Sequence, residues 1–258
     1  MSIITVLTDF GIKDPYVGIM KGVMLSINPD LSLVDIAHEV EPQDVREAAF
    51  LIPEYYPYFT PGTVHLCVVD PTVGSSRKAI VIAKEGHLFV GPDNGLFSMI
   101  MDGARAYEIT NVTLTLGQLS STFHGRDLFS PVAAHLSKGI DPTTVGPLLA
   151  EPICLDGLKP VLKDDMLVGE IVRFDRFGNG ITNIHHEDFR GFAGRSEYSV
   201  EIGDLSFYHF SRSYSESEFT LIMGSSGYLE FGLYKGSIRK RKGFAKGTHV
   251  AVRRNRSE

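Results

Sequence analysis

Residues 3–11, Ile-Ile-Thr-Val-Leu-Thr-Asp-Phe-Gly, join a continuous apolar run to a short polar turn. A run of this kind, rich in β-branched residues, predicts a strand that is buried on both faces. Residues 16–27 follow with apolar side chains at helical spacing, and Asn28-Pro29-Asp30 ends that helix. A buried strand, a polar turn and a helix in this order predict the first unit of an α/β fold.

The same alternation continues to about residue 150. We expect further strands at residues 31–36, 64–69, 79–83 and 87–90, and further helices at 42–58 and 128–136. Strands that alternate with helices predict mainly parallel pairing, with helices on both faces of the sheet. Ligands of such sheets bind at the carboxyl ends of the strands, so polar residues that follow a strand are candidate site residues.

The pattern changes after about residue 160. Short alternating segments recur about every ten residues, at 167–174, 180–184, 198–202, 205–210, 219–223, 228–233 and 248–252. With turn residues and no helix between them, they predict an antiparallel sandwich or barrel. Residues 156–160, Asp-Gly-Leu-Lys-Pro, form a plausible linker. We therefore predict an N-terminal α/β domain over residues 1–157, with a mainly parallel sheet, and a small C-terminal antiparallel β-barrel domain over 163–258.

Composition excludes several classes of protein. Apolar residues make up 43 % of the chain and charged residues 22 %, which excludes a disordered or fibrous chain. No apolar run has the length of a bilayer crossing, and the first residues lack the basic and apolar regions of a signal peptide. The two cysteines, Cys67 and Cys154, form neither a disulfide framework nor a zinc motif. We expect a soluble, cytoplasmic protein.

Charge is unevenly distributed along the chain. Nine basic residues and one acidic residue give residues 235–258 a net charge of +8, which leaves −14 for the rest because the whole chain carries −6. A basic tail can bind phosphate. The alternative is a solvated end, or one that pairs with the protein's own acidic body. We favour the alternative, since no aromatic residues are interleaved with the charges, and we expect no nucleic-acid partner.

Two segments place acidic side chains directly after buried strands. Asp9, with Phe10 and the nearby Asp14, follows the first strand, and a carboxylate there can accept hydrogen bonds from a ribose diol. The alternative for Asp9 or Asp14 is to cap the following helix. Asp70 opens the loop Asp-Pro-Thr-Val-Gly-Ser-Ser-Arg, which ends at Arg77 and can also be explained as an ion pair that staples the loop.

Two further segments combine aromatic and polar residues. His124, within Thr122-Phe123-His124-Gly125-Arg126-Asp127, is a candidate general base or hydrogen-bond donor, and the following Asp127 can be an N-cap. Residues 174–183 carry aromatic side chains beside amides, which suits binding of a heteroaromatic base, although Asn179-Gly180 by itself predicts a type I′ turn. Ser225-Ser226-Gly227-Tyr228 has similar chemistry.

The combination and order of these motifs resemble the S-adenosylmethionine hydroxide adenosyltransferases, which are homologues of fluorinating and chlorinating enzymes that use the same substrate. The matching stretches run from residue 8 to about 236 and include residues 8–11, 14–18, 69–77, 91–95, 122–127, 175–183 and 224–227. The resemblance implies an α/β domain followed by a small β-barrel. It also implies a homotrimer with sites between neighbouring subunits.

The resemblance implies hydrolysis of S-adenosyl-L-methionine to adenosine and L-methionine. By motif position Asp70, Arg77 and His124 are the catalytic residues, which hold and polarise a water that attacks C5′ of the ribose. The substrate-binding residues implied are Asp9, Phe10, Asp14, Val73, Phe123, Gly125, Asp175, Phe177, Asn179, Ser225 and Tyr228. No metal or other cofactor is implied, and we interpret His185-His186-Glu187 as an exposed turn.

Two alternatives stay open. The first is a non-catalytic protein that binds adenine nucleosides, with the basic tail and the barrel contacting RNA. The second is a halogenase, but halogenating enzymes of the resembled family carry an aromatic residue in place of the Asp and lack the His. A carboxylate at Asp70 would repel a halide, so halogenation is disfavoured.

Overall fold

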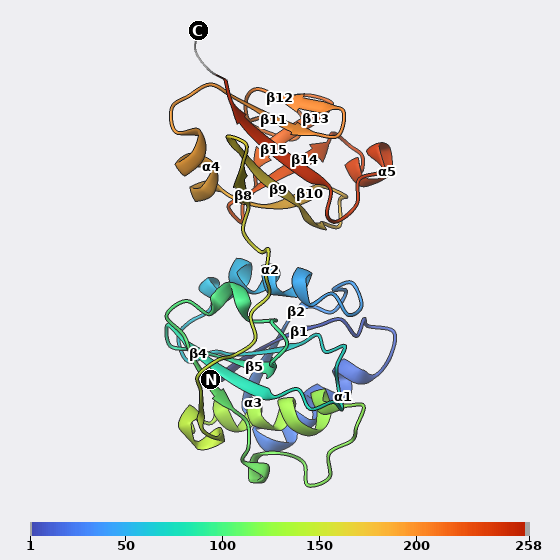
Figure 1. Ribbon diagram of the computed structural model, residues 1–258. Helices are drawn as coiled ribbons and strands as arrows, with labels where there is room; N and C mark the ends of the chain where they lie inside the picture. Colours follow the sequence, from blue (N-terminus) through green and yellow to red (C-terminus); the bar gives the residue numbers. More distant parts are fainter. Residues whose placement is uncertain (1, 256–258) are drawn as a thin grey trace. The chain divides into compact units, whose positions relative to one another are not determined.

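The computed structural model describes residues 2–255, and the chain divides into two compact units, residues 1–156 and 157–258 (Figure 1). The first unit is mixed α/β and the second is built mainly from antiparallel strands. This is the predicted fold class, an α/β part followed by a small β-barrel part. Among the helices described, none is both long and apolar enough to cross a membrane.

The first unit is built around one seven-stranded sheet in the order β2-β1-β3-β5-β4-β6-β7. The strands are β1 Ser2–Thr8, β2 Leu31–Ala37, β3 Val64–Val68, β4 Ala79–Lys84, β5 His87–Pro92, β6 Arg105–Glu108 and β7 Leu148–Leu149. Strands β2, β1, β3 and β5 are parallel, and β4, β6 and β7 extend the sheet by antiparallel pairing. The carboxyl ends of the four parallel strands therefore meet at one edge.

Helices cover both faces of this sheet (Figure 1). On one face α1 (Tyr16–Ile27) and α3 (Ser130–Ser137) bury Met20, Met24 and Val132 against the strands. On the other face α2 (Val45–Tyr55) contributes Ala48 and Ile52 to a separate core. Single turns lie at Tyr56–Tyr58, Ser98–Ile100, Val112–Leu114, Gly125–Phe129 and Pro142–Val145, the one at Gly125–Phe129 being a π-turn.

Two of the predicted helices have different bounds. The helix expected at residues 42–58 begins at Val45, because the Asp44 carboxylate accepts the Glu47 N–H at 2.8 Å and so caps it. The helix expected at 128–136 is preceded by the π-turn over Gly125–Phe129, in which the Ser130 hydroxyl donates to the Gly125 carbonyl at 2.7 Å. The extra residue of a π-turn is often found at functional sites.

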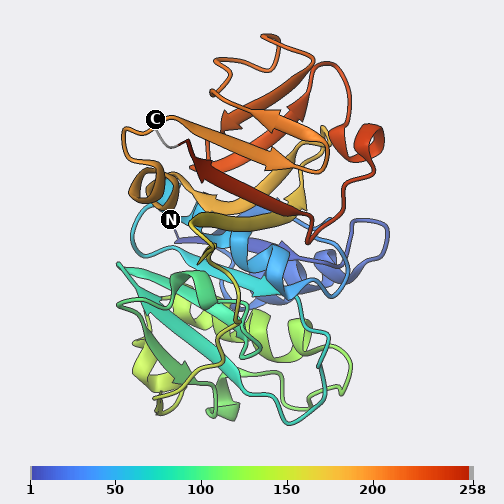
Figure 2. The ribbon, with the colours of Figure 1, turned by 45° about the horizontal axis from the view of Figure 1, so that its top comes forward.

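The second unit wraps antiparallel strands around one apolar core (Figure 2). The main order is β12-β11-β15-β9-β10-β14-β13, with β8 paired to β9. The strands are β8 Val161–Lys163, β9 Met166–Phe174, β10 Gly180–His185, β11 Tyr198–Ile202, β12 Leu205–Phe207, β13 Phe219–Met223, β14 Tyr228–Leu233 and β15 His249–Arg254. They form a nearly closed barrel, as predicted.

The prediction that no helix interrupts these strands was wrong. Helix α4 (His186–Ala193) begins where we expected an exposed turn at His185-His186-Glu187, and a short α5 covers Ile238–Lys242. The signal for α4 is present in the sequence. Phe189, Phe192 and Ala193 share one face at helical spacing and are all buried.

Three basic side chains of the described C-terminal segment contact other residues of their own unit. Lys242 binds the Asp204 carboxylate at 2.7 Å, and Arg253 binds Glu201 at 3.1 Å. The Arg254 guanidinium lies 4.5 Å from the centre of the Phe192 ring. These contacts agree with the interpretation of the tail as a charged end that pairs with the acidic body.

Two loops of the first unit pack together through a glycine. Gly74, in the loop after β3, has φ +79°, and a Cβ added there would lie 2.2 Å from the Ser121 carbonyl oxygen. Only glycine permits both this conformation and this approach. The loop that begins at Asp70 is therefore held against the loop that carries His124.

We predict that Gly74→Ala destabilises the protein more than Gly139→Ala does. Gly139 has φ +86° but open space around its Cβ position, so its substitution carries only the conformational cost of about 1 kcal/mol. Gly74→Ala adds a clash with backbone that cannot move away. Equal shifts in the midpoint of chemical unfolding for the two variants would contradict the close approach.

A buried polar cluster crosses the middle of the first sheet. Thr5 Oγ1 lies 2.7 Å from His65 Nδ1, and His65 Nε2 lies 3.1 Å from His87 Nδ1. The His65 ring also stacks on Phe89 with centroids 4.7 Å apart. Burial, together with the neighbouring His87, lowers the pKa of His65 to about 3. His65 therefore stays neutral in the folded protein from about pH 6.5, where the unfolded chain gains a proton, down to about pH 3.

We predict that His65 makes stability fall as the pH falls. Between about pH 6.5 and pH 3 the unfolded state binds a proton that folded His65 does not, so the free energy of unfolding decreases by at most about 1.4 kcal/mol per pH unit from this residue. His65→Phe should be less stable than wild type near pH 7.5, with the difference narrowing near pH 5 in chemical unfolding. Thr5→Val, which keeps His65, should retain the wild-type acid slope. A difference between His65→Phe and wild type that does not change with pH would contradict this assignment.

Candidate active site

Polar side chains gather where the parallel strands end. Asp9 and Phe10 follow β1, and Asp70 follows β3 after one residue. The side-chain amide of Asn94, just after β5, donates to the Val69 carbonyl at 2.9 Å. This bond ties the loop after β5 to the end of β3. Three neighbouring loops thus form one edge of the sheet, as the strand order requires.

Asp70 and Arg77 form a buried ion pair across the ends of their loop. Arg77 Nε donates to both carboxylate oxygens of Asp70, at 3.1 and 3.0 Å, and Nη2 also donates to Oδ2. The two side chains are only 4 % and 6 % exposed. The guanidinium carbon lies 5.1 Å from the centre of the Phe129 ring. The pair does staple the loop, as one alternative expected, and it also presents charged groups at the site.

Arg77 reaches the third residue of the cluster directly. Its Nη2 lies 2.8 Å from Nδ1 of His124. A guanidinium can only donate, so Nδ1 must accept, and in neutral His124 the proton is on Nε2. Burial and the Arg77 charge lower the pKa of His124, while Asp70 and Asp127 oppose that shift. His124 is therefore a neutral imidazole whose Nε2–H is a hydrogen-bond donor.

Asp127 holds the loop on which His124 lies. Its carboxylate accepts the Ser120 N–H at 2.8 Å and Arg126 Nε at 2.5 Å, and the residue is 1 % exposed. Asp127 lies inside the π-turn that starts at Gly125, so the expectation that it is an N-cap was wrong. Its role depends on a contact across seven residues of a loop, which no local pattern in the sequence signals.

An aromatic cluster lies beside these polar groups. The ring of Phe123 is 6.1 Å from Phe10 and 5.3 Å from Tyr16, and Phe10 is 6.0 Å from Tyr16, all edge to face. A Cβ added to Gly125 would lie 3.1 Å from Met20 Sδ and 3.3 Å from the Phe123 ring, so glycine permits the packing. Tyr16 was not among the predicted site residues. The cluster offers an apolar surface for a flat ring.

The remaining predicted residues of the first unit differ in their surroundings. The Asp9 carboxylate accepts the Gln43 N–H at 2.8 Å. Burial raises the pKa of Asp9; the Gln43 hydrogen bond partly offsets this rise, and the nearby Asp70 charge adds to it.

Asp14 is exposed and does not cap α1, because Pro15 occupies the cap position and no side chain bonds there. The capping alternative for Asp14 was wrong. Val73 is half-buried in the Asp70 loop, where its N–H donates to the Asp70 carbonyl at 3.3 Å.

Asp175 and Asn179 close one turn of the second unit. The Asp175 carboxylate accepts the backbone N–H and the side-chain amide of Asn179 at 2.8 and 2.9 Å. The expected type I′ turn at Asn179-Gly180 was wrong. The turn lies earlier, over residues 175–178, where the Gly178 N–H donates to the Asp175 carbonyl and Gly178 has a φ of +86°. Gly180 already begins β10. Phe177 at the tip is 77 % exposed.

Ser225 and Tyr228 lie at the other end of the same strand pair. Gly180 pairs with Phe231 and His185 with Tyr228, so Tyr228 is next to the far end of β10. A Cβ added to Gly232 would lie 3.1 Å from Asn179 Oδ1, which places Asn179 four residues along β14 from Tyr228. Four strand residues span about 13 Å. Within one chain the structure does not bring these two predicted groups together.

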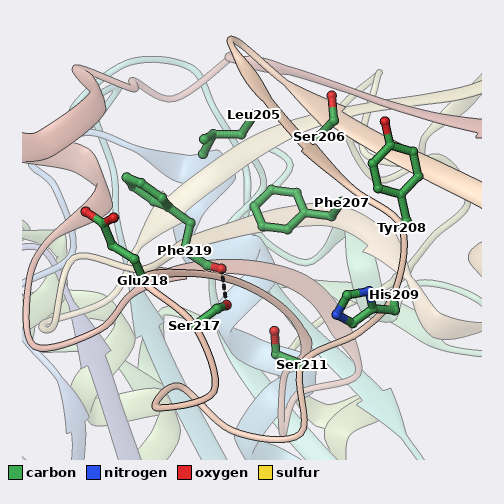
Figure 3. Close-up of a pocket in the computed structure, with 9 residues that line it drawn as sticks. All are labelled: Leu205, Ser206, Phe207, Tyr208, His209, Ser211, Ser217, Glu218 and Phe219. Atoms are coloured by element: carbon green, nitrogen blue, oxygen red, sulfur yellow. Dashed lines mark hydrogen bonds between the residues drawn. The ribbon is translucent and has the colours of Figure 1, made fainter.

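The second unit has a surface groove of its own. A groove of about 400 Å³ runs between β12 and the start of β13 and is lined by Phe207, Tyr208, Glu218 and Phe219 among others (Figure 3). None of the predicted site residues line it. Within residues 2–255 no group of three or more His, Cys, Asp or Glu side chains is arranged to hold a metal ion.

The sequence and the fold of this chain are similar to those of known proteins. An (R)-S-adenosyl-L-methionine hydrolase of Thermus thermophilus is 36 % identical over 95 % of this chain and 97 % of its own length. A fluorinase of Nocardia brasiliensis is 32 % identical over 72 % of both chains. A crystal structure of an uncharacterized conserved protein from Thermotoga maritima matches with a TM-score of 0.88 and 35 % identity, covering 97 % of this chain and 100 % of that one.

Family models match both units. Residues 4–146 match the SAM hydroxide adenosyltransferase N-terminal domain, and residues 169–251 match the C-terminal domain of the same family. The matches cover most of the chain and fall in the family's order. The chain belongs to the SAM hydroxide adenosyltransferase family.

Proposed function

We propose that this protein hydrolyses S-adenosyl-L-methionine to adenosine and L-methionine, with Asp70, Arg77 and His124 as its catalytic residues. The observation that carries the proposal is the hydrogen-bonded cluster of these three side chains at the carboxyl edge of the sheet, in which the Asp70 and Arg77 side chains are buried and His124 is half-buried. Hydrolase relatives align with most of this chain, which supports the same activity.

The reaction is a displacement at C5′ of the ribose. A water oxygen bonds to C5′ as the C5′–S bond breaks, and the bonding pair stays on sulfur, which becomes the neutral thioether of methionine. The leaving group is already a cation, so no acid has to protonate it. The protein has to place the water in line with the C5′–S bond and accept its proton.

The hydrogen bonds of the cluster support one division of these tasks. His124 Nδ1 is occupied by Arg77 and its Nε2 carries a proton, so His124 donates to the water instead of accepting its proton. Asp70 is the acceptor of the cluster: Arg77 donates to both of its oxygens, and the Thr72 hydroxyl donates to Oδ1 at 3.3 Å, a long bond that the water would replace. The Arg77 charge stabilises the anionic oxygen that develops during attack.

We propose that the adenine ring and the ribose of the substrate contact different residues. The aromatic cluster of Phe10, Tyr16 and Phe123 suits the adenine ring, and Asp14 suits the ribose diol. Asp175, Phe177 and Asn179 lie too far along the barrel from Ser225 and Tyr228 to contact the same small group in one chain. Sites shared by neighbouring subunits of a homotrimer, as the family resemblance implies, would allow both groups to contribute.

Charge at the cluster favours water over halide as the nucleophile. At about 4 Å and an effective dielectric constant near 20, a carboxylate repels a halide by roughly 4 kcal/mol. Water is attracted by the same carboxylate. The Asp70 carboxylate therefore disfavours a halide at the position of the water, although the Arg77 charge offsets part of this repulsion and fluorinases are relatives of this chain.

The direct test is incubation with S-adenosyl-L-methionine in ¹⁸O-labelled water. Attack at C5′ places the label in adenosine, and chromatography with mass detection separates adenosine from methionine. Parallel reactions with fluoride or chloride should give no 5′-halogenated nucleoside. Unchanged substrate after long incubation would support the non-catalytic nucleoside binder instead, and binding to RNA that weakens steeply with salt would extend that alternative.

We predict that His124→Ala lowers kcat by about 10²-fold or more, since a preorganised donor is lost from the transition state. KM should change little, and the thermal midpoint should stay near that of wild type because His124 lies half-buried at the N-cap of the π-turn and not in the core. Exposed His249→Ala is the matched control and should be fully active. Asp70→Asn is preferable to Asp70→Ala as a companion, because Asn keeps an oxygen that can accept from Arg77, whereas Ala would leave the buried guanidinium with no acceptor there. Near-wild-type turnover of both variants would remove the proposed catalytic roles.

We predict that Asp14→Ala weakens binding of adenosine by at least about tenfold without lowering stability. Two charge-assisted hydrogen bonds to a ribose diol are each worth about 1.5–3 kcal/mol, and about 1.4 kcal/mol is a factor of ten. Asp14 makes no capping bond, so the thermal midpoint should not move. Calorimetric titration with adenosine and 2′-deoxyadenosine checks this. Equal affinity of the wild type for the two ligands would show that Asp14 does not bind the diol.

A further inference from the structure

A chain of buried hydrogen bonds lies beneath the loop that carries Asp9 and Phe10. Thr8 Oγ1 is 2.8 Å from His38 Nδ1, and His38 Nε2 is 2.9 Å from Asp35 Oδ1. Lys21 of α1 donates to the other oxygen of Asp35 at 2.6 Å. Thr8 is fully buried and His38 is 6 % exposed, whereas the Asp35 side chain is 48 % exposed. The chain thus runs from the surface to the end of β1.

The chemistry of its members fixes the direction of every bond. The hydrogen bonds from Lys21 and His38 lower the pKa of Asp35 overall, although partial burial raises it, so Asp35 is an ionised acceptor. In the neutral imidazole of His38, Nε2 therefore carries the proton and Nδ1 accepts the hydroxyl proton of Thr8. The Thr8 oxygen is left with lone pairs, and the Phe10 N–H donates to it at 3.3 Å.

His38 also holds the far side of the same loop. The Gly11 N–H donates to the His38 carbonyl at 2.7 Å. Thr8, Phe10 and Gly11 are thus fixed from one residue, which lies just after β2. The position of Phe10 determines its edge-to-face contacts with Tyr16 and Phe123, because its ring packs against both.

We propose that His38, oriented by Asp35, is a positioning residue that sets Phe10 for substrate binding through Thr8. The inference rests on the proposed function, since Phe10 matters to catalysis only if the aromatic cluster holds the nucleoside. His38 touches none of the three proposed catalytic residues, so it acts on binding and not on the displacement step.

The same strand supplies a matched control. Thr5 is also fully buried and its hydroxyl is also hydrogen-bonded to a buried histidine, His65, at 2.7 Å. Thr5 lies in the middle of β1, and its partner His65 is hydrogen-bonded to His87 and not to a proposed site residue. Removing either hydroxyl leaves a buried histidine nitrogen without a partner, so both losses lower stability. Only the loss at Thr8 should change substrate binding.

The experiment compares Thr8→Val, Thr8→Ser and Thr5→Val in the full-length protein. Thr8→Val should raise KM for S-adenosyl-L-methionine, and Kd for adenosine, by about fivefold, the factor for a net loss of roughly 1 kcal/mol. Its kcat should stay within about twofold of wild type. Thr8→Ser restores the hydroxyl and should bring KM back. Thr5→Val should lower the thermal midpoint with no change in KM.

A pair of surface variants tests the same chain if Thr8→Val does not fold. Asp35→Asn can present an amide N–H to His38 Nε2, which favours the other histidine tautomer and removes the acceptor that Thr8 uses. It should raise KM by about threefold. Lys21→Met removes the other partner of Asp35 and should leave KM unchanged.

The outcomes separate the two proposals. A wild-type protein that does not hydrolyse S-adenosyl-L-methionine overturns the proposed function and this inference with it. An active wild type in which Thr8→Val and Asp35→Asn keep the wild-type KM overturns the positioning role alone. An equal rise in KM for Thr5→Val and Thr8→Val would also overturn it, because the effect would then follow from lost stability.

Discussion

The buried ion pair between Asp70 and Arg77 is the constraint on which the carboxyl edge of the first sheet depends. Two opposite charges that are almost completely removed from water must satisfy each other and find further partners. Arg77 does so by donating to Asp70 and to His124 while its guanidinium packs on Phe129. The loop after β3, the His124 loop and the π-turn are thereby held as one unit. Gly74 permits this arrangement because it lets the first two loops touch through their backbones.

The same pair determines which proton each group can offer. Arg77 has only donors, so it makes His124 an acceptor at Nδ1 and leaves a donor at Nε2. Asp70 presents its carboxylate oxygens in the same cluster. The Asp70 carboxylate as acceptor and the His124 Nε2–H as donor are together suited to hold a water molecule. The sulfonium leaving group of the substrate departs as a neutral thioether, so it requires no proton donor. The chemistry that we propose thus needs no more titratable groups than the cluster contains.

The sequence was sufficient to predict the two-part architecture and the loops that carry the candidate residues, because buried parallel strands are continuous apolar runs and the polar turns follow them. It was not sufficient where a role depends on distant contacts. Asp127 was expected to cap a helix, but its carboxylate holds Ser120 across a loop. Helix α4 was missed although Phe189, Phe192 and Ala193 carry its periodicity, because a strand-rich context suggested a turn. His38 was not predicted as a site residue, because nothing near it in the sequence indicates that Thr8, 30 residues earlier, is its partner.

Two histidines at this edge carry the same tautomer for opposite reasons, and the difference explains their separate roles. Arg77 can only donate, so it fills Nδ1 of His124 and leaves the Nε2–H available to a ligand. Asp35 can only accept, so it consumes the Nε2–H of His38 and turns Nδ1 toward the protein's own Thr8. A histidine whose proton faces outward can act on a bound water. A histidine whose donor and acceptor are both used within the fold can only fix the position of its neighbours, which is the role that we assign to His38.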